Sequence, residues 1–270
     1  MKPFESRHWI FLGLLIVVVA TMLMNISTKV TPAQDTRKLY RIVDSLPAGS
    51  SIMISFDHEA SALPEIRPLT LAILRHAFSR GHHLIGVALL AEGTGIGYRS
   101  LEQVASEYGK VYGTDFAYLG FQPQSTAAIL SMGESVKATF PRDYLGTPYD
   151  SVPLLTSVEN YRQIAMVISI ADGSLTTQWI EYGKARFEVP IVAVVTAAMV
   201  TTYDPYVASG QLTAMIGGLR GAAEYEELIH HRGSGARGML AQTSAHIYVV
   251  AMIVLGNIIY FRSRRKRGKA

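Results

Sequence analysis

The sequence predicts an α/β domain of three layers, Rossmann-like or flavodoxin-like, with about five mostly parallel strands and a transmembrane helix at each end. Three observations predict this class. An uncharged apolar run lies near each end of the 270 residues. Between these runs, short apolar segments alternate with segments of helical periodicity, as in strands joined by crossover helices. Only 17% of the residues are charged, against about 25% in an ordinary soluble domain, and the apolar runs account for the difference.

Composition excludes several protein classes. With 49% hydrophobic residues and no cysteine, the chain is not disordered, collagen-like or disulfide-stapled, and it has no Cys-ligated metal and no Cys nucleophile. Residues 262–270 carry six positive charges and residues 1–8 a net charge of +1, so the other 253 residues sum to −3. The positive net charge therefore belongs to a tail, and we expect no nucleic-acid partner.

The first apolar run predicts a transmembrane helix over residues 9–26. Residues 9–24 carry no charge, and Asn25 and Ile26 extend the run to eighteen residues, close to the roughly 20 that cross a bilayer. Trp9 lies at the expected interface. A cleaved signal peptide is the alternative, because Lys2 and Arg7 precede the apolar core. No small-residue cleavage pair follows the run, which favours an uncleaved anchor.

The second apolar run predicts a transmembrane helix over residues 245–261. It contains no Lys, Arg, Asp or Glu, has Tyr248 and Tyr260 near its ends, and is followed directly by the basic tail. A buried core helix would not end in such a tail. Asn257 lies inside the run, where an amide prefers a partner on another helix. The alternative for Asn257 is a tolerated polar residue near the interface.

Flanking charges predict the topology. The termini carry eight Lys and Arg and the inner flanks six, so both termini are expected in the cytoplasm and the middle of the chain outside it, in the cell (inner) membrane. The expected segments are cytoplasmic tails at 1–8 and 262–270, linkers at 27–46 and 232–244, and an extracytoplasmic domain at 47–231. A third apolar stretch, 189–203, could span and reverse this topology. It is short and β-branched, which favours a buried strand with its following turn.

Within the domain, strands and helices are expected to alternate. Each expected strand is a short apolar run, and each helix has apolar residues three or four apart. The helix that follows the first strand also has Ser61 as a possible N-cap and Gly81 at its end. The expected strands cover 51–56, 83–90, 116–121, 165–171 and 189–198, and the expected helices cover 63–80, 101–108, 124–132, 174–183 and 206–229.

Residues 134–157 interrupt this alternation. Three prolines and three aromatic residues lie within residues 140–153. A long aromatic loop of this kind is typical of a lid, a binding loop or a contact surface. A proline-stiffened cover over a sheet edge is the equal alternative.

Acidic residues follow three of the expected strands. Parallel sheets bind ligands at the carboxyl ends of their strands, and Asp57, Glu59, Glu92 and Asp172 would lie there. Such carboxylates could act as acid and base, or hold a divalent cation, with Asp57 and Asp172 as the metal ligands. The alternative is that they cap helices or form a solvated rim.

A glycine-rich segment, with Gly93, Gly95 and Gly97, lies between an expected strand and an expected helix. That position suits a phosphate-binding turn. The spacing departs from G-x-G-x-x-G and no Walker lysine follows, so a flexible turn is the alternative. The histidines lack metal-ligand spacing, and no G-x-S-x-G motif is present. We therefore expect no cofactor beyond a possible divalent cation.

Small residues recur every four positions in the last expected helix, at Gly210, Ala214, Gly218 and Ala222. Glycine inside a helix costs about 1 kcal/mol relative to alanine, so the repeat indicates a packing role. The stripe would pack on the domain's own sheet, or it would contact another subunit or a membrane-proximal partner.

Several stretches resemble an uncharacterised group of prokaryotic two-pass membrane proteins with a Rossmann-like extracytoplasmic domain. The resemblance covers most of the chain and implies the same order of anchor, domain and anchor, with no known activity. The stretches are residues 55–65, 107–113, 140–148, 217–226 and 255–257.

Three functions remain open on the sequence. The first is a membrane-tethered binding or assembly module, whose partners are the lipid bilayer and either a second copy or another membrane protein. The second is a membrane-anchored enzyme, metal-dependent or acid–base, with its site at the four carboxylates. The third is nucleotide sensing at residues 93–97.

Overall fold

A computed structural model describes residues 6–24 and 30–267, which belong to two compact units. Residues 30–235 form the α/β unit. The other unit contains α1 (Ser6–Leu23) and all of α12 (Gly235–Arg267) except its first residue. Residues 1–5 of the expected N-terminal tail, Asn25 and Ile26 of the expected first span, and residues 268–270 of the basic tail lie outside the described residues.

The α/β unit is built on a sheet of six parallel strands in the order β3-β2-β1-β4-β5-β6. This is the Rossmann order, and it differs from the flavodoxin order 2-1-3-4-5. The five expected strands are confirmed, and a sixth completes the sheet. The strands are β1 (Ser51–Asp57), β2 (His83–Ala88), β3 (Phe116–Phe121), β4 (Ile164–Ala171), β5 (Ile191–Val195) and β6 (Ala214–Gly217).

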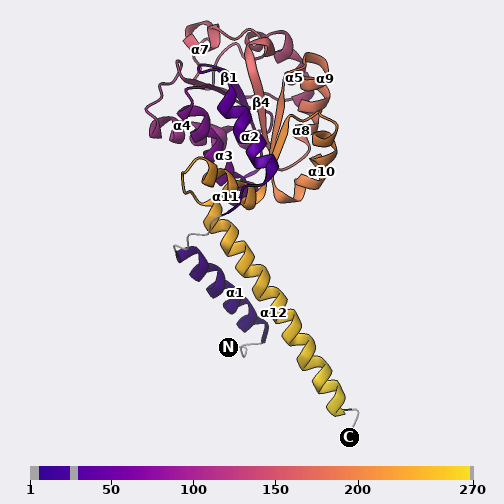
Figure 1. The fold of residues 1–270 in the computed structure, drawn as a ribbon. Coiled ribbons are helices and arrows are strands. Elements are labelled where there is room, and N and C mark those ends of the chain that lie inside the picture. The colour runs from indigo at the N-terminus through magenta and orange to yellow at the C-terminus, as the bar shows by residue number, and fades with distance from the viewer. Residues whose placement is uncertain (1–5, 25–29, 268–270) are drawn as a thin grey trace. The chain divides into compact units, whose positions relative to one another are not determined.

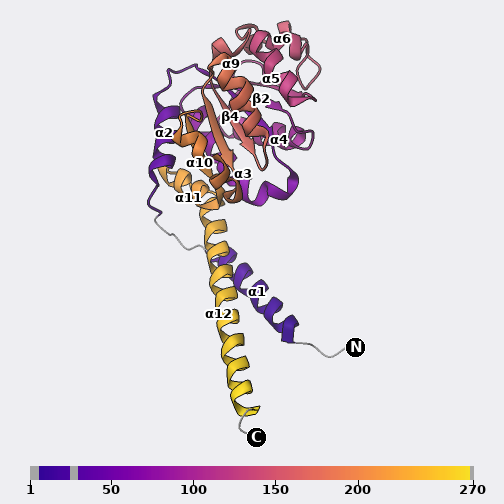
Figure 2. The ribbon, with the colours of Figure 1, turned by 90° about the vertical axis from the view of Figure 1, so that its right-hand side faces the viewer.

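Helices cover both faces of the sheet (Figure 1, Figure 2). One face is covered by α2 (Gln34–Ser45), α3 (Leu63–Ser79), α4 (Gly93–Glu107) and α11 (Gly218–Leu228). The other face is covered by α5 (Ser125–Glu134), α6 (Val136–Thr139), α7 (Pro153–Thr156), α8 (Leu175–Gln178), the π-helical turn η4 (Trp179–Lys184), α9 (Ala185–Phe187) and α10 (Ala197–Ala208). Three single turns complete the unit: η1 (Ala60–Ala62), η2 (Tyr149–Ser151) and η3 (Tyr161–Gln163).

The strands are apolar on both faces because both faces are buried. In β1, Ile52 and Ile54 pack against the face that carries α3, whereas Met53 packs against the opposite face. In β5, Val192 and Val194 alternate in the same way with their neighbours. This continuous burial explains why short β-branched runs are a sufficient signal for these strands.

Helix α4 crosses the end of β1 at very close range, and the glycines of its first turns allow this approach. A Cβ atom at Gly93 would overlap the carbonyl oxygen of Phe56, and one at Gly97 would lie 2.5 Å from the Phe56 ring. At Gly95 the nearest atom would be 3.8 Å away, at the end of the Arg99 side chain. The expected flexible turn at residues 93–97 is therefore wrong, because these residues are the packed start of a helix.

The single helix expected over residues 206–229 is also wrong. Gly210 has a φ of +76° in the turn after α10, and Ala214 begins strand β6, which pairs with β5. Gly218 has a φ of +69° as the first residue of α11, and Ala222 lies further along the same helix. Two glycines in the left-handed region cannot continue a helix across this segment. The four residues therefore form no common helical face.

The segments expected as linkers contain regular structure. Residues 34–45 form α2, whose Leu39 and Val43 are fully buried, and residues 235–244 are the first three turns of α12. The third apolar stretch divides into the expected strand, β5, and helix α10 in place of a turn. Residues 134–157 contain three short helical segments, α6, η2 and α7.

The second unit consists of two apolar helices. Among the described residues, one helix segment, Gly235–Arg262, is long and apolar enough to cross a bilayer, and none of its most apolar window is buried. The apolar part of α1, Arg7–Leu23, is shorter. The hydroxyl of Tyr248 donates a hydrogen bond to the carbonyl oxygen of Ile10 at 2.9 Å, so this aromatic side chain links the two helices.

Replacing Gly93 tests the contact between α4 and β1. Gly93→Ala should lower the free energy of unfolding by about 3 kcal/mol, because the added methyl group meets backbone that cannot move aside. Gly95→Ala is the matched control, since its methyl group meets open space, and it should leave stability unchanged or raise it by up to about 1 kcal/mol. Urea unfolding in detergent, followed by Trp179 fluorescence in a Trp9→Phe background, measures both. Equal effects of the two substitutions would refute the contact.

Candidate functional site

The carboxyl ends of β1 and β4 form the first candidate site. The chain crosses over in opposite directions from these neighbouring strands, and Rossmann-like sheets bind their ligands at this point. Asp57 is the last residue of β1, and Asp172 follows β4 directly. Glu59 lies in the loop after β1, and Glu92 precedes α4, whose first residue, Gly93, lies against the Phe56 carbonyl oxygen near the end of β1. The fold thus places all four expected carboxylates at the carboxyl edge of the sheet, around the ends of the neighbouring strands β1 and β4.

Asp57 is buried, and both of its carboxylate oxygens accept hydrogen bonds from other groups of the protein. Its side chain is 1% exposed. One carboxylate oxygen accepts a hydrogen bond from the Ser55 hydroxyl at 2.6 Å, and the other accepts one from the Leu89 N–H at 2.7 Å. Burial raises the pKa of Asp57 to about 6, against the opposing effect of these hydrogen bonds. Asp57 therefore ties the end of β1 to the end of β2, and a substrate cannot reach it in this conformation.

Asp172 ties together the loops after β1 and β4. One of its carboxylate oxygens accepts a hydrogen bond from the backbone N–H of Glu59 at 2.9 Å. His58, in the loop after β1, is 1% exposed, and its Nδ1 lies 3.2 Å from the Glu59 carbonyl oxygen. Burial lowers the pKa of its imidazole. The side chains of Glu59 and Glu92 are exposed. Within the described residues, no group of three or more His, Asp or Glu side chains is placed to hold a metal ion.

Glu65 is a site residue that the sequence analysis missed. It lies in the first turn of α3, and its carboxylate accepts a hydrogen bond from the Ala197 N–H at 2.6 Å, at the beginning of α10. An acidic side chain at a helix N-terminus compensates for N–H groups that have no partner in the helix. Its position directly after Pro64 marks a first helical turn in the sequence, but nothing there identifies α10 as its partner.

The glycine-rich segment has a packing explanation. Gly93 and Gly97 face β1, as described above, and the backbone of Phe56 occupies the space beside Gly93. Gly95 faces away from β1 towards the Arg99 side chain. The expected phosphate-binding role of these three glycines stays a prediction that the packing does not require.

The aromatic loop closes one edge of the sheet. The N–H of Tyr144 donates to the carbonyl oxygen of Tyr118 in edge strand β3 at 2.8 Å. Asp143, which is 5% exposed, accepts hydrogen bonds from the Tyr112 hydroxyl at 2.8 Å and from the Thr147 N–H at 2.7 Å. The loop therefore covers a sheet edge, which was one of the two expectations for it. The side chains of Tyr144 and Leu145 are exposed at its tip.

Helix α11 is the second candidate site, because three consecutive buried polar side chains on it hold other segments. Glu224 accepts hydrogen bonds from the Ala33 N–H at 3.0 Å and the Thr36 hydroxyl at 2.6 Å, at the beginning of α2. Glu226 accepts one from the Gly235 N–H at 2.8 Å, at the beginning of α12. Both segments that lead to the apolar helices are thus attached to α11 by carboxylates two residues apart.

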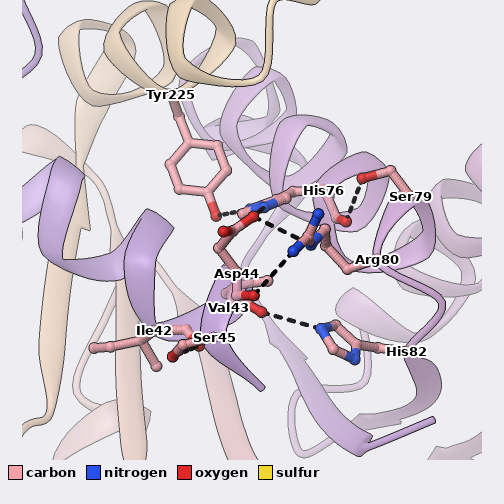
Figure 3. Close-up of polar contacts among 9 residues, drawn as sticks. All are labelled: Ile42, Val43, Asp44, Ser45, His76, Ser79, Arg80, His82 and Tyr225. Carbon is pink, nitrogen blue, oxygen red and sulfur yellow. Dashed lines mark hydrogen bonds and ion pairs between the residues drawn. The ribbon is translucent and has the colours of Figure 1, made fainter. Parts of the chain in front are cut away.

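Between these two carboxylates, Tyr225 is hydrogen-bonded to His76, a buried histidine of α3 that lies beside the C-terminal turn of α2 (Figure 3). Its hydroxyl lies 2.8 Å from Nδ1 of His76, whose Nε2 lies 3.5 Å from a carboxylate oxygen of Asp44. The Tyr40 ring stacks on the imidazole with the centroids 4.4 Å apart. Burial lowers the pKa of His76 to about 4, although Asp44 opposes this. His76 is therefore neutral at pH 7.

Two more basic side chains hold the C-terminus of α2 (Figure 3). Nε2 of His82 lies 3.0 Å from the carbonyl oxygen of Val43, so Nε2 carries the proton of the neutral ring. Its buried Nδ1 has no hydrogen-bond partner in the described part of the chain. Nε of Arg80 lies 3.1 Å from the Asp44 carboxylate. Because α2, α3 and α11 are far apart in sequence, no local motif marks this cluster.

Asp57→Asn should abolish a specific pH dependence of stability. The pKa of Asp57 is about 6 in the folded chain and about 3.8 when unfolded, so the folded state binds more protons between these values. Stability therefore falls as pH rises from about 4 to 6, by about 3 kcal/mol. The amide of Asn carries no charge: its oxygen can accept from the Leu89 N–H, and its NH2 group can donate to the Ser55 hydroxyl oxygen. Urea unfolding at pH 4 to 7 measures the change, with exposed Glu92→Gln as control; an unchanged pH profile in Asp57→Asn would contradict it.

His76→Gln should remove a pH dependence of stability that has the opposite sign. Its pKa of about 4 when folded lies below the ordinary 6.5, so the unfolded state takes up the proton first as pH falls. The stability that neutral His76 provides is complete above pH 6.5 and decreases by about 3 kcal/mol towards pH 4. Because Asp57 acts oppositely over this range, the comparison belongs in an Asp57→Asn background, with exposed His231→Gln as control. A loss of stability towards acid pH that is as large in His76→Gln as in the parent Asp57→Asn chain would refute the assignment.

Comparisons with known proteins do not assign the chain to a family. No family model matches the sequence. No curated protein matches it either. Among solved structures, the chain is similar to the C-terminal domain of a glycosyl transferase group 1 family protein (LpcC) from Francisella tularensis, with 12% identity and a TM-score of 0.36 over 82% of this chain and 94% of that one. This is a distant structural match.

Proposed function

We propose that the chain is a two-pass membrane protein whose α/β unit is a non-enzymatic binding or assembly module outside the cytoplasm. The attachment of both connecting segments to α11, through Glu224 and Glu226, carries the proposal. If both ends of the unit are anchored in the same membrane, the two connecting segments must emerge from the unit close to each other. Carboxylates two residues apart on one helix provide that arrangement.

The apolar helices support the tethering. One segment of α12 is long and apolar enough to cross a bilayer, and α1 provides a shorter apolar helix. Arg262 and Arg264, in the basic tail that follows the second apolar run, favour cytoplasmic termini. No second function is needed to explain these features.

The hydrogen bonds at the carboxyl edge favour a module over an enzyme. Both oxygens of Asp57 and one of Asp172 accept hydrogen bonds from internal donors, which is the capping role expected of structural carboxylates. The proposed partners are the bilayer and a second copy or another membrane protein. Asn257 remains the residue proposed for contact with another helix, although its amide donates to Ile253 of its own helix at 2.9 Å.

Cysteine labelling tests the proposed topology, because the native chain has no cysteine. Leu145→Cys at the exposed tip of the aromatic loop should react with a membrane-impermeant maleimide in intact cells. A cysteine added after Ala270 should react only once the membrane is permeabilised. Ile168→Cys, whose position is fully buried in β4, is the control that should react only after unfolding.

Two results would overturn the proposal. Labelling of Leu145→Cys that requires permeabilisation would place the α/β unit in the cytoplasm. Release of the chain from membranes by alkaline carbonate would exclude integral anchoring.

A further inference from the structure

Helix α2 has one face buried in the core and one basic face exposed. Thr36, Leu39 and Val43 are buried, at the spacing of one helical stripe. The side chains of Arg37, Lys38 and Arg41 are exposed, and we call these three residues the α2 basic face. None of the three forms an ion pair within the described residues, although Nε of Arg37 donates to the Pro32 carbonyl oxygen at 3.0 Å. Their charge is therefore available to a partner outside the α/β unit.

This basic face contrasts with the rest of the unit. Residues 30–235 contain 15 Lys and Arg against 20 Asp and Glu, which gives a net charge of −5. Three of the 15 basic residues lie within five positions on one helix, with Asp35 as the one exposed acidic residue before them. A general excess of basic residues cannot explain this concentration, and its charge suits an anionic partner.

Chain connectivity limits how far α2 can be from the bilayer. Seven residues, 27–33, separate the first expected span from α2, and seven extended residues reach about 25 Å at most. On the other side, residues 235–244 of α12 precede the second span, and ten helical residues rise about 15 Å. The surface potential of anionic lipids acts over about 10 Å at physiological ionic strength. The short connections therefore allow the tethered unit to bring α2 within this range.

We propose that the α2 basic face binds the headgroups of anionic phospholipids in the leaflet next to the α/β unit. Guanidinium groups suit this partner because their fork of donors matches phosphate oxygens. The proposal rests on the membrane anchoring proposed above and adds a partner chemistry to it. An acidic protein would need the same charges, but its binding would not depend on the charge of the lipid.

Fluorescence quenching in nanodiscs tests the proposal on the full chain. Gln34→Cys, at the exposed beginning of α2, carries the fluorophore, and spin-labelled lipids in the disc quench it. Quenching should be stronger in discs that contain phosphatidylglycerol than in discs of phosphatidylcholine alone. Neutralising the α2 basic face (Arg37→Gln, Lys38→Gln and Arg41→Gln) should remove the difference, with the ratio of docked to undocked unit falling roughly fivefold per residue.

The matched control replaces three exposed basic residues elsewhere on the unit: Arg99→Gln, Arg162→Gln and Arg186→Gln. This variant should keep the response to anionic lipid, and both triple variants should keep the Trp179 fluorescence of the folded chain. Equal quenching in the two kinds of disc, or an unchanged response after the α2 basic face is neutralised, would overturn the headgroup binding alone. Failure of the chain to co-elute with nanodiscs would instead overturn the anchoring, and the headgroup binding with it.

Discussion

The α/β unit depends on hydrogen bonds that backbone N–H groups donate to carboxylate side chains. Asp57, Glu65 and Asp172 each connect the end of one strand or helix to a segment distant in sequence. Glu224 and Glu226 do the same for the two segments that lead to the apolar helices. A charged acceptor makes a stronger hydrogen bond than a neutral one, and a buried N–H without a partner is costly. These few side chains therefore set where loops and helix ends lie.

The same hydrogen bonds explain why the carboxylates at the carboxyl edge connect loops and strand ends, although the sequence also suggested a metal or acid–base site there. Acidic residues after parallel strands are typical of a metal site and equally typical of caps, and only the identity of their partners separates the two. That identity depends on strand order. Asp172 reaches the Glu59 N–H because β1 and β4 are neighbours, although 113 residues separate Glu59 from Asp172. The sequence therefore located the carboxylates, but not the donors that they bind.

Long or strongly patterned elements were predictable, and short ones at the end of the domain were not. The five expected strands are apolar runs buried on both faces, which leaves a clear signal. Strand β6 has four residues, Ala214–Gly217, and is followed by Gly218, and its small residues also fit a helical repeat. Helix α2 could have been found, because Thr36, Leu39 and Val43 have the spacing of a buried stripe. Its short charged sequence beside an apolar run was instead assigned to a linker.

The order of the strands also governs how the chain reaches its folded state. Strand β1 pairs on one side with β2, which follows closely, but on the other side Ser51 pairs with Ile164. Until residues 164–171 are synthesised, one edge of β1 has no partner. A bare edge of apolar strand can pair with another chain, and pairings between distant residues form slowly. The interval between β3 and β4, which includes the aromatic loop, is therefore the period in which the nascent chain is most exposed to aggregation.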